Sequence, residues 1–521
     1  MQANASMIGK NAFADNPIIY HIFTDRFDAP IREYGPEQVG TFLGGRFCGI
    51  TAKLREGWFC RLGVNALLIS APFEQIRGWV PGGEGSFRHY GYHGYYALDY
   101  TVIDSRFGNE TDLRELVTVA HDLGIRVLLD VVLNHPGYHD LQSMHELGLD
   151  VLRSGWEDAA PNDYWRHFDF DHADFAQWWG PSWVRAALPG YPPGGEDDLT
   201  MLLAGLPDFR TESRAPVRLP RFLQEKADSR ASELPGTSVR GYVIHWLTTW
   251  VREMGIDGFR CDSAKHVELD AWFELKCAAN ASKEAWCRSG ANPETGDESF
   301  WMMGEVYGQG IDWSPYFEFG FDSLLNFNFQ YEIENGSDLD GVYRQYAASL
   351  SGSPGYNVVS YISSHDTHLF QRERLIEGGT ALLLAPGGVL MLYGDETARL
   401  PGPPTPGDPA QETRSPMNWD DVEQDVLEHW RKLGSFRARH VSIARGAHCK
   451  LQDAPYAFSR KHASGDSVVV APYACDEIEL PVAHVFEDGA WLHDAYSGWR
   501  GRVASGKVVV PAAGCVLLER L

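Results

Sequence analysis

Gly258-Phe259-Arg260-Cys261-Asp262-Ser263-Ala264-Lys265-His266 reads as the end of a buried strand that runs into polar residues. Alternate residues of a strand point to the same side, so Arg260 and Asp262 should share a face. A guanidinium that close favours the ionised carboxylate at neutral pH, which a nucleophile attacking a sugar carbon requires. The alternative is a buried structural ion pair, and this stretch alone favours neither interpretation.

Three other apolar runs end in the same way. Asp130-Val131-Val132-Leu133-Asn134-His135 closes one run, Glu305 follows Phe300-Trp301-Met302-Met303, and Asp366 follows Val358-Val359-Ser360-Tyr361-Ile362. Such runs are typical of strands in buried parallel sheets. Four of them in order, with helix-period segments between, predict a barrel with polar residues gathered at the carboxyl ends of its strands.

The rest of the chain continues the alternation of strand and helix. Between Asp112 and Leu123 apolar residues recur at helical spacing, and a second helical face is formed by Val243, Leu247, Trp250 and Met254. We therefore predict a (β/α)₈ TIM barrel of the α/β class. Its other strands are expected at Ile18–Phe23, Ala66–Ile69, Ile125–Leu129, Phe321–Phe329 and Val389–Tyr393.

The barrel is predicted in two parts, residues 1–135 and 241–440. Over residues 136–240 the periodicity fails and Gly, Pro, Trp and Asp accumulate. Roughly a hundred irregular residues are too many for a loop, so we expect an inserted subdomain after the third strand. Over residues 441–521, short strand-like runs separated by Gly and Asp turns predict a C-terminal β-sandwich domain.

Charge and composition disfavour several classes of binding partner. The 45 Lys and Arg residues against 71 Asp and Glu residues give a net charge of −26, which disfavours binding to nucleic acid or an anionic membrane and suits a neutral substrate. No apolar run approaches about 18 residues and no export signal is recognisable, so a soluble, cytoplasmic protein is expected from the sequence as it stands. The eight cysteines form no CxxC pair and are expected to be free thiols, which favours a reducing compartment.

The four strand ends resemble, in order, the four sequence regions of the α-amylase family of glycoside hydrolases. Leu206-Pro207-Asp208-Phe209 resembles the short family motif between the first and second regions. The likeness is strongest to the periplasmic α-amylases of enteric bacteria and runs from about Pro17 to about His440. It implies export to the periplasm or medium, in contrast to the compartment that the cysteines favour.

Retaining cleavage of a glycosidic bond needs an ionised carboxylate that attacks the anomeric carbon and a protonated one that serves the leaving oxygen. Asp262 beside Arg260 fits the first role. Glu305, after an apolar run, fits the second because burial should raise its pKa. The resemblance implies the same two roles and makes Asp366 the third acid, which binds sugar hydroxyls and favours the distorted ring.

The resemblance also implies residues that hold the substrate. Tyr95 would stack under the sugar at the cleavage point, His135 and His365 would hydrogen-bond that sugar, and Lys265 with His266 would contact sugars on the leaving side. As lone histidines, His135 and His365 would more often be structural. The full predicted set is Tyr95, His135, Arg260, Lys265, His266 and His365.

A structural calcium ion is implied by the resemblance as well, between the barrel and the inserted subdomain. Asn134, Asp208 and the backbone carbonyl of His266 match three of its ligand positions, and Asp198 is a candidate for another. We expect a monomeric, endo-acting α-amylase that hydrolyses α-1,4-glucosidic bonds in starch, maltodextrins and maltooligosaccharides. An α-glucosidase or a maltooligosaccharide transglycosylase of the same fold is the alternative.

Overall fold

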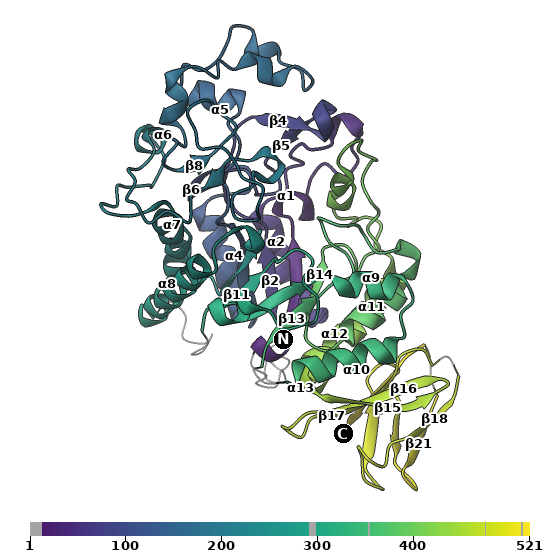
Figure 1. Cartoon of the computed structure of the whole chain (residues 1–521). Helices are drawn as coiled ribbons and strands as arrows, with labels where there is room; N and C mark the ends of the chain where they lie inside the picture. The colour runs from purple at the N-terminus through teal and green to yellow at the C-terminus, as the bar shows by residue number, and fades with distance from the viewer. Residues whose placement is uncertain (1–12, 291–298, 353–354, 475, 512–513) are drawn as a thin grey trace.

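The computed structural model describes residues 13–290, 299–352, 355–474, 476–511 and 514–521. Eight parallel strands close into a barrel in the order β1-β14-β13-β12-β11-β10-β7-β2, and β2 pairs back with β1 (Figure 1). The predicted (β/α)₈ barrel is thus confirmed. The barrel strands are β1 Ile18–Ile22, β2 Ala66–Ile69, β7 Arg126–Val132, β10 Gly258–Asp262, β11 Trp301–Gly304, β12 Ser323–Asn326, β13 Asn357–Ser360 and β14 Gly388–Leu392.

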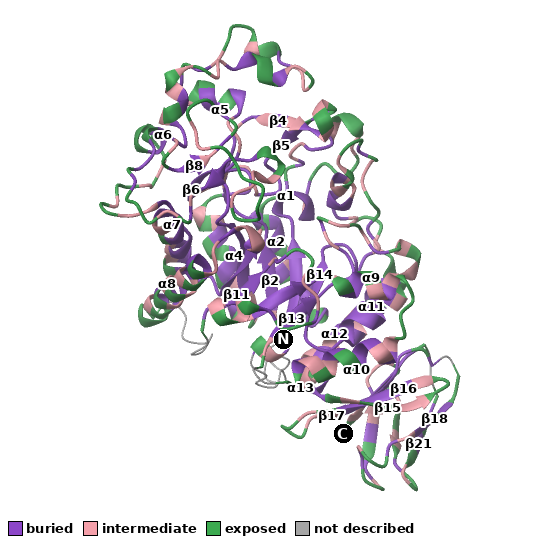
Figure 2. Cartoon of the chain, in the orientation of Figure 1, coloured by how far each residue is buried: buried purple, intermediate pink, exposed green. Residues whose placement is uncertain are grey.

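The barrel strands are buried on both faces, as Figure 2 shows by their colour. One set of their side chains fills the barrel interior, including Ile19, Leu68, Leu128 and Met303, and the alternate set packs against the surrounding helices. Those helices are α2 Phe47–Arg55, α4 Glu110–Asp122, α7 Val239–Met254, α8 Leu269–Arg288, α10 Leu339–Leu350, α11 Leu375–Leu383 and α12 Gln424–Arg439.

The sixth strand is shorter than predicted. The sequence pattern predicts a strand from Phe321 to Phe329, whereas β12 ends at Asn326 and the helix α9, Asn328–Glu334, follows. The apolar residues beyond Asn326 are spaced for a helix, because Phe329 and Ile333 are both buried on one face of α9.

Two long connections lie at the carboxyl ends of the strands. After β2, two short antiparallel pairs that the sequence did not predict carry the chain outward: β3 Phe73–Gln75 with β6 Ala97–Ile103, and β4 Trp79–Gly82 with β5 Phe87–Tyr90. After β7, the segment that leads to α7 holds only short elements, namely α5 Leu141–Glu146, α6 Arg221–Glu225, several 3-10 turns and the pair β8 Val184–Arg185 with β9 Asp208–Phe209. This agrees with the irregular insertion expected after the third strand.

The C-terminal part is all β after a short helix, α13 Val441–Arg445. A six-stranded sheet and a two-stranded sheet share one apolar core that includes Val469, Leu518, Leu480 and Val510. The six-stranded sheet lies beside α10 and α13 (Figure 1), and His448 Nε2 lies 2.9 Å from Asp340 Oδ1 of α10. Its strands are β15 Ala447–Asp453, β16 Tyr456–Lys461, β17 Ser467–Ala471, β22 Val516–Arg520, β19 Trp491–Asp494 and β20 Arg500–Arg502, and the pair is β18 Ile478–Pro481 with β21 Lys507–Val510.

Seven of the eight cysteines lie in the described part of the chain, and all seven are free thiols. Cys475 lies outside the described residues. Among the described helices, none combines the length and apolar character needed to cross a bilayer.

Candidate active site

The buried guanidinium of Arg260 lies at the centre of a group of carboxylates. In the barrel register Arg260 is directly opposite Asp130 of β7, and its Nη1 lies 3.0 Å from Asp130 Oδ1 and 2.5 Å from Asp262 Oδ1. Its Nη2 lies 3.2 Å from Glu305 Oε2 and 3.8 Å from Asp366 Oδ2. One side chain therefore contacts all three acids that the sequence analysis singled out, and the predicted shared face of Arg260 and Asp262 is observed.

Ser263 connects the first two acids. Its hydroxyl lies 2.7 Å from Asp262 Oδ2, and its backbone N–H donates to Glu305 Oε2 over 2.8 Å. This serine has a φ of 50°, in the left-handed region that residues with a side chain rarely adopt. The unusual backbone turn directs the N–H of Ser263 toward β11, where Glu305 follows the last residue of the strand.

Glu305 binds a proton more tightly than an ordinary glutamate does. Burial raises the pKa of Glu305 to about 8, and the nearby charges of Asp262 and Asp366 add to this effect, whereas Arg260 opposes it. Its Oε2 is occupied by two donors, Ser263 N–H and Arg260 Nη2. A proton on this carboxyl group therefore belongs on Oε1.

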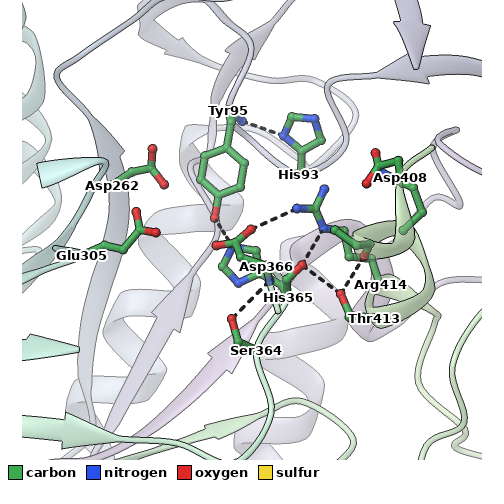
Figure 3. Close-up of polar contacts among 12 residues, drawn as sticks. His93, Tyr95, Asp262, Glu305, Ser364, His365, Asp366, Asp408, Thr413 and Arg414 are labelled. Atoms are coloured by element: carbon green, nitrogen blue, oxygen red, sulfur yellow. Dashed lines mark hydrogen bonds and ion pairs between the residues drawn. The ribbon is translucent and has the colours of Figure 1, made fainter. Parts of the chain in front are cut away.

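Asp366, in contrast to Glu305, has a lowered pKa and is ionised. Burial by itself would raise its pKa, but His365 Nε2 at 2.8 Å from Oδ2 and the charges of Arg414 and Arg260 outweigh burial and hold the pKa well below its usual range. Arg414 Nη2 lies 3.2 Å from Asp366 Oδ1 (Figure 3). Arg414 ends the 3-10 segment Pro409–Arg414, which belongs to the loop after β14.

Tyr95 belongs to the connection after β2, between β5 and β6, and its hydroxyl reaches the acids. Its hydroxyl donates to Asp130 Oδ2 over 2.8 Å and lies 2.9 Å from His365 Nε2. Its ring is nearly parallel to the rings of His93 and His365, with centroids 5.2 and 5.8 Å away. In Figure 3 the carboxylates of Asp262 and Glu305 lie to the left of Tyr95, and His365 and Asp366 lie below the Tyr95 hydroxyl.

His135 and His365, the two histidines expected to hold the sugar, are buried, and their lowered pKa values keep them neutral. Burial lowers the pKa of His135 to about 4 and also lowers the pKa of His365. The Nδ1 of His135 lies 3.0 Å from Asn134 Oδ1, and its Nε2 has no hydrogen-bond partner among the described residues. His135 thus offers a buried ring nitrogen that a ligand hydroxyl can satisfy.

Lys265 and His266, in the 3-10 turn after β10, both contact the inserted segment. Lys265 Nζ lies 3.0 Å from Asp198 Oδ2, and His266 Nδ1 lies 2.7 Å from the backbone oxygen of Asp198. These contacts bring the insertion next to the end of β10, three and four residues beyond Asp262.

The four residues that the resemblance assigns to calcium do not form an oxygen cage. Asn134, Asp208 and the carbonyl of His266 do come together, but Asn134 Nδ2 donates to Asp208 Oδ1 and to His266 O, and Arg185 pairs with Asp208. The carboxylate of Asp198 pairs with Lys265 instead. Within the described residues no group of three or more His, Cys, Asp or Glu side chains suits a metal ion.

Arg414, Ser263 and Asp130 are the parts of the site that the sequence analysis did not assign. Asp130 lies inside the buried run of β7, and a carboxylate within such a run is a signal that could have identified it. Its register partner is Arg260. Neither the left-handed turn at Ser263 nor the return of Arg414 from a proline-rich loop leaves a local pattern in the sequence.

The chain is similar to alpha-amylases and to a cyclomaltodextrinase. The family model "Alpha amylase, catalytic domain" matches residues 21–182. Over 497 residues the chain is 44% identical to a periplasmic alpha-amylase of Escherichia coli, a match that covers 88% of this chain and 72% of that protein. It is 23% identical over 482 residues to a cyclomaltodextrinase of Thermoanaerobacter pseudethanolicus, covering 87% of this chain and 69% of that protein.

A solved structure supports the same fold. An alpha-amylase from Geobacillus thermoleovorans, in complex with acarbose, superposes with a TM-score of 0.68 at 20% identity, covering 98% of this chain and 99% of that one. At this level of identity the likeness concerns the fold alone.

Proposed function

Because this chain belongs to the α-amylase family of glycoside hydrolases, we propose that Asp262, Glu305 and Asp366 hydrolyse α-1,4-glucosidic bonds by a double displacement that retains the anomeric configuration. One observation carries the assignment: the single guanidinium of Arg260 contacts all three carboxylates. The substrates are starch, maltodextrins and maltooligosaccharides.

Asp262 is the nucleophile in this proposal. Arg260 contacts one carboxylate oxygen of Asp262 and the hydroxyl of Ser263 contacts the other, so both oxygens are held in position. One carboxylate oxygen attacks the anomeric carbon as the bond from that carbon to the glycosidic oxygen breaks. The product is a glycosyl ester of Asp262.

Glu305 is the acid and then the base. Its raised pKa keeps a proton on Oε1 at neutral pH, and this proton passes to the departing glycosidic oxygen. The Glu305 carboxylate left behind takes a proton from a water molecule, whose oxygen attacks the anomeric carbon of the ester. This second displacement frees Asp262, restores the proton on Glu305 and retains the original configuration.

Asp366 binds the sugar rather than reacting with it. It is the most exposed of the three acids, with a third of its side chain accessible, and it is kept ionised by His365, Arg414 and Arg260. A carboxylate there accepts hydrogen bonds from hydroxyls of the sugar at the cleavage point. Tyr95, His135 and His365 surround the same position, and the ring of Tyr95 supplies an apolar surface for it.

Cleavage inside a chain is supported by the contacts of Lys265 and His266 with Asp198. The inserted segment is thereby held beside the leaving side of the cleavage point, so sugars on both sides of the bond can contribute binding energy. The proposed reaction uses no metal ion. The N–H groups of Asn134 and Arg185 that contact Asp208 do not suit calcium, which binds oxygen ligands.

A time course with maltoheptaose tests the proposal. We expect internal cleavage into fragments of two or more glucose units, with the α-anomer appearing before mutarotation in proton NMR. Early release of single glucose units, with maltose as a good substrate, would identify an α-glucosidase. Products longer than the substrate would identify a transglycosylase, and a β-anomer appearing first would exclude double displacement.

A further inference from the structure

Arg185 and Asp208 face each other across the short pair β8–β9. The register pairs these two residues directly, and Arg185 Nη1 lies 2.6 Å from Asp208 Oδ2. The other terminal nitrogen, Nη2, lies 2.7 Å from Glu212 Oε1. The side chain of Arg185 is 11% exposed and that of Asp208 is 3% exposed, so the pair they form is largely protected from water, whereas Glu212 is 37% exposed.

The neighbouring oxygen atoms are also satisfied by protein donors. The amide nitrogen of Asn134 donates to Asp208 Oδ1 over 3.1 Å and to the carbonyl oxygen of His266 over 3.0 Å. The amide oxygen of Asn134 faces His135 Nδ1 at 3.0 Å, and a proton on that nitrogen fixes which end of the amide points toward Asp208. The oxygens of Asp208 and His266 thus face N–H groups.

These contacts join three parts of the chain. Asn134 follows β7, His266 follows β10, and Asp208 and Arg185 belong to the inserted segment. A structural calcium ion at this place would connect the same parts, but it needs about six to eight oxygen ligands at roughly 2.3–2.6 Å. The guanidinium of Arg185 repels a divalent cation, and it already binds the Asp208 oxygen that such an ion would need as a ligand.

We propose that the guanidinium of Arg185 takes the place of a structural calcium ion between the barrel and the inserted segment, so that the fold of this protein does not depend on calcium. The positive charge is supplied by the chain itself through the ion pairs with Asp208 and Glu212. The amide of Asn134 supplies the link to the end of β10.

The first measurement is thermal unfolding of the wild-type protein. We expect the same Tm after treatment with EDTA, after removal of the chelator and in millimolar calcium, and less than stoichiometric calcium by elemental analysis of the protein purified in its presence. A lower Tm in EDTA that calcium restores, together with one bound calcium per chain, would overturn the proposal.

The second measurement uses Arg185→Met, which keeps the apolar stem and removes the charge. Loss of one partner of a buried pair should lower the Tm by on the order of 5 °C. Because Asp208 and Glu212 then lack their cation, millimolar calcium should raise the Tm of this variant, by mass action on the folded state. A destabilised variant that ignores calcium would show that the ion and the guanidinium do not compete for the same oxygens.

Arg214→Met is the matched control. Arg214 lies in the same segment and pairs with Asp270 and Glu274, but its side chain is 57% exposed, so its loss should change the Tm little and create no response to calcium. If Arg185→Met does not fold, Arg185→Lys keeps the charge without the fork. That variant should fold with a lowered Tm and no response to calcium, and a calcium response from it would contradict the proposal.

Discussion

The backbone N–H of Ser263 donates to Oε2 of Glu305 over 2.8 Å, so the residue next to the proposed nucleophile holds the proposed acid in place. The same serine reaches Asp262 with its hydroxyl. A left-handed backbone costs a residue with a side chain about 1–2 kcal/mol. Two hydrogen bonds to carboxylates offset a cost of this size, since each is worth roughly 1.5–3 kcal/mol.

Replacing either reacting acid should abolish turnover without unfolding the protein. Asp262→Asn removes the nucleophilic charge and Glu305→Gln removes the transferable proton, and both keep the shape of the side chain. We expect activity on soluble starch to fall by on the order of a thousandfold or more in each variant. Glu157→Gln, on an exposed glutamate of the inserted segment, is the control and should retain full activity. Retention of more than about a tenth of the activity by either active-site variant would refute its assigned role.

The activity should decline on the alkaline side as Glu305 loses its proton. Because the protonated form is the proposed acid catalyst, kcat/KM should decrease as the pH rises through about 8, the pKa that burial imposes on Glu305. Initial rates on maltoheptaose between neutral pH and strongly alkaline pH measure this limb. A rate that stays constant well above that value would mean that Glu305 is not the proton donor.

Removing the hydroxyl of Ser263 should weaken the nucleophile while leaving the acid in place. Ser263→Ala keeps the backbone N–H that Glu305 accepts but loses the contact with Asp262, so we expect kcat to fall about tenfold. The alkaline limb of the pH profile should not move. Ser263→Gly loses the same hydroxyl but accommodates the φ of 50° without strain, so it should match the alanine variant in activity and unfold at a higher temperature.

Lys265→Ala should penalise long substrates more than short ones. Lys265 Nζ pairs with Asp198 on the leaving side of the proposed cleavage point. We expect kcat/KM to decrease more for maltoheptaose than for maltotriose, because only the longer chain uses that side fully. Asp198→Ala distinguishes the two explanations: equal effects would mean that Lys265 acts only by holding Asp198, whereas a smaller effect would indicate direct contact of Lys265 with sugar.

The C-terminal sheet should lose stability at alkaline pH through His440. His440 Nδ1 lies 2.8 Å from Asp466 Oδ1 and its Nε2 lies 2.7 Å from Glu519 Oε2. Burial alone would lower the pKa of His440, but the hydrogen bonds to Asp466 and Glu519 outweigh it and raise the pKa above its usual value. A raised pKa in the folded protein contributes stability that is fully present below about 6.5 and is lost as the pH rises through the folded value.

The opposite holds for Glu519, whose pKa is lowered to about 2 although burial opposes the shift. Its contribution to stability is present above about pH 4.3, the usual pKa of glutamate. It is lost as the pH falls toward about 2, the pKa of Glu519 in the folded protein. Thermal unfolding followed against pH should therefore show a maximum from this cluster on the acid side of neutrality. His440→Gln should remove the alkaline decline, and an unchanged decline would assign it to another group. Arg439 and His493, which also contact Glu519, remain in that variant.

The sequence predicts the barrel and the convergence of Asp262, Glu305 and Asp366 because both depend on strand ends. Asp262, Glu305 and Asp366 each follow a buried apolar run, and parallel strands bring such positions together at one end. Arg414 could not be placed in this way, because a long proline-rich loop returns it to Asp366 after β14. The contact of Arg185 with Asp208 could not be predicted either, because it depends on the two-residue pairing of β8 with β9. The strand Phe73–Gln75 is too short to show an alternation.

The position of Arg260 among Asp130, Asp262, Glu305 and Asp366 has a consequence for inhibitors. Four carboxyl groups share one central guanidinium, with Arg414 as a second positive charge beside Asp366. A sugar analogue with a protonated ring nitrogen brings the charge that this surplus of acids favours. Its affinity should rise as Glu305 ionises near pH 8 and continue to rise until the amine itself loses its proton. Inhibition by such amines and catalysis therefore have opposite dependences on pH.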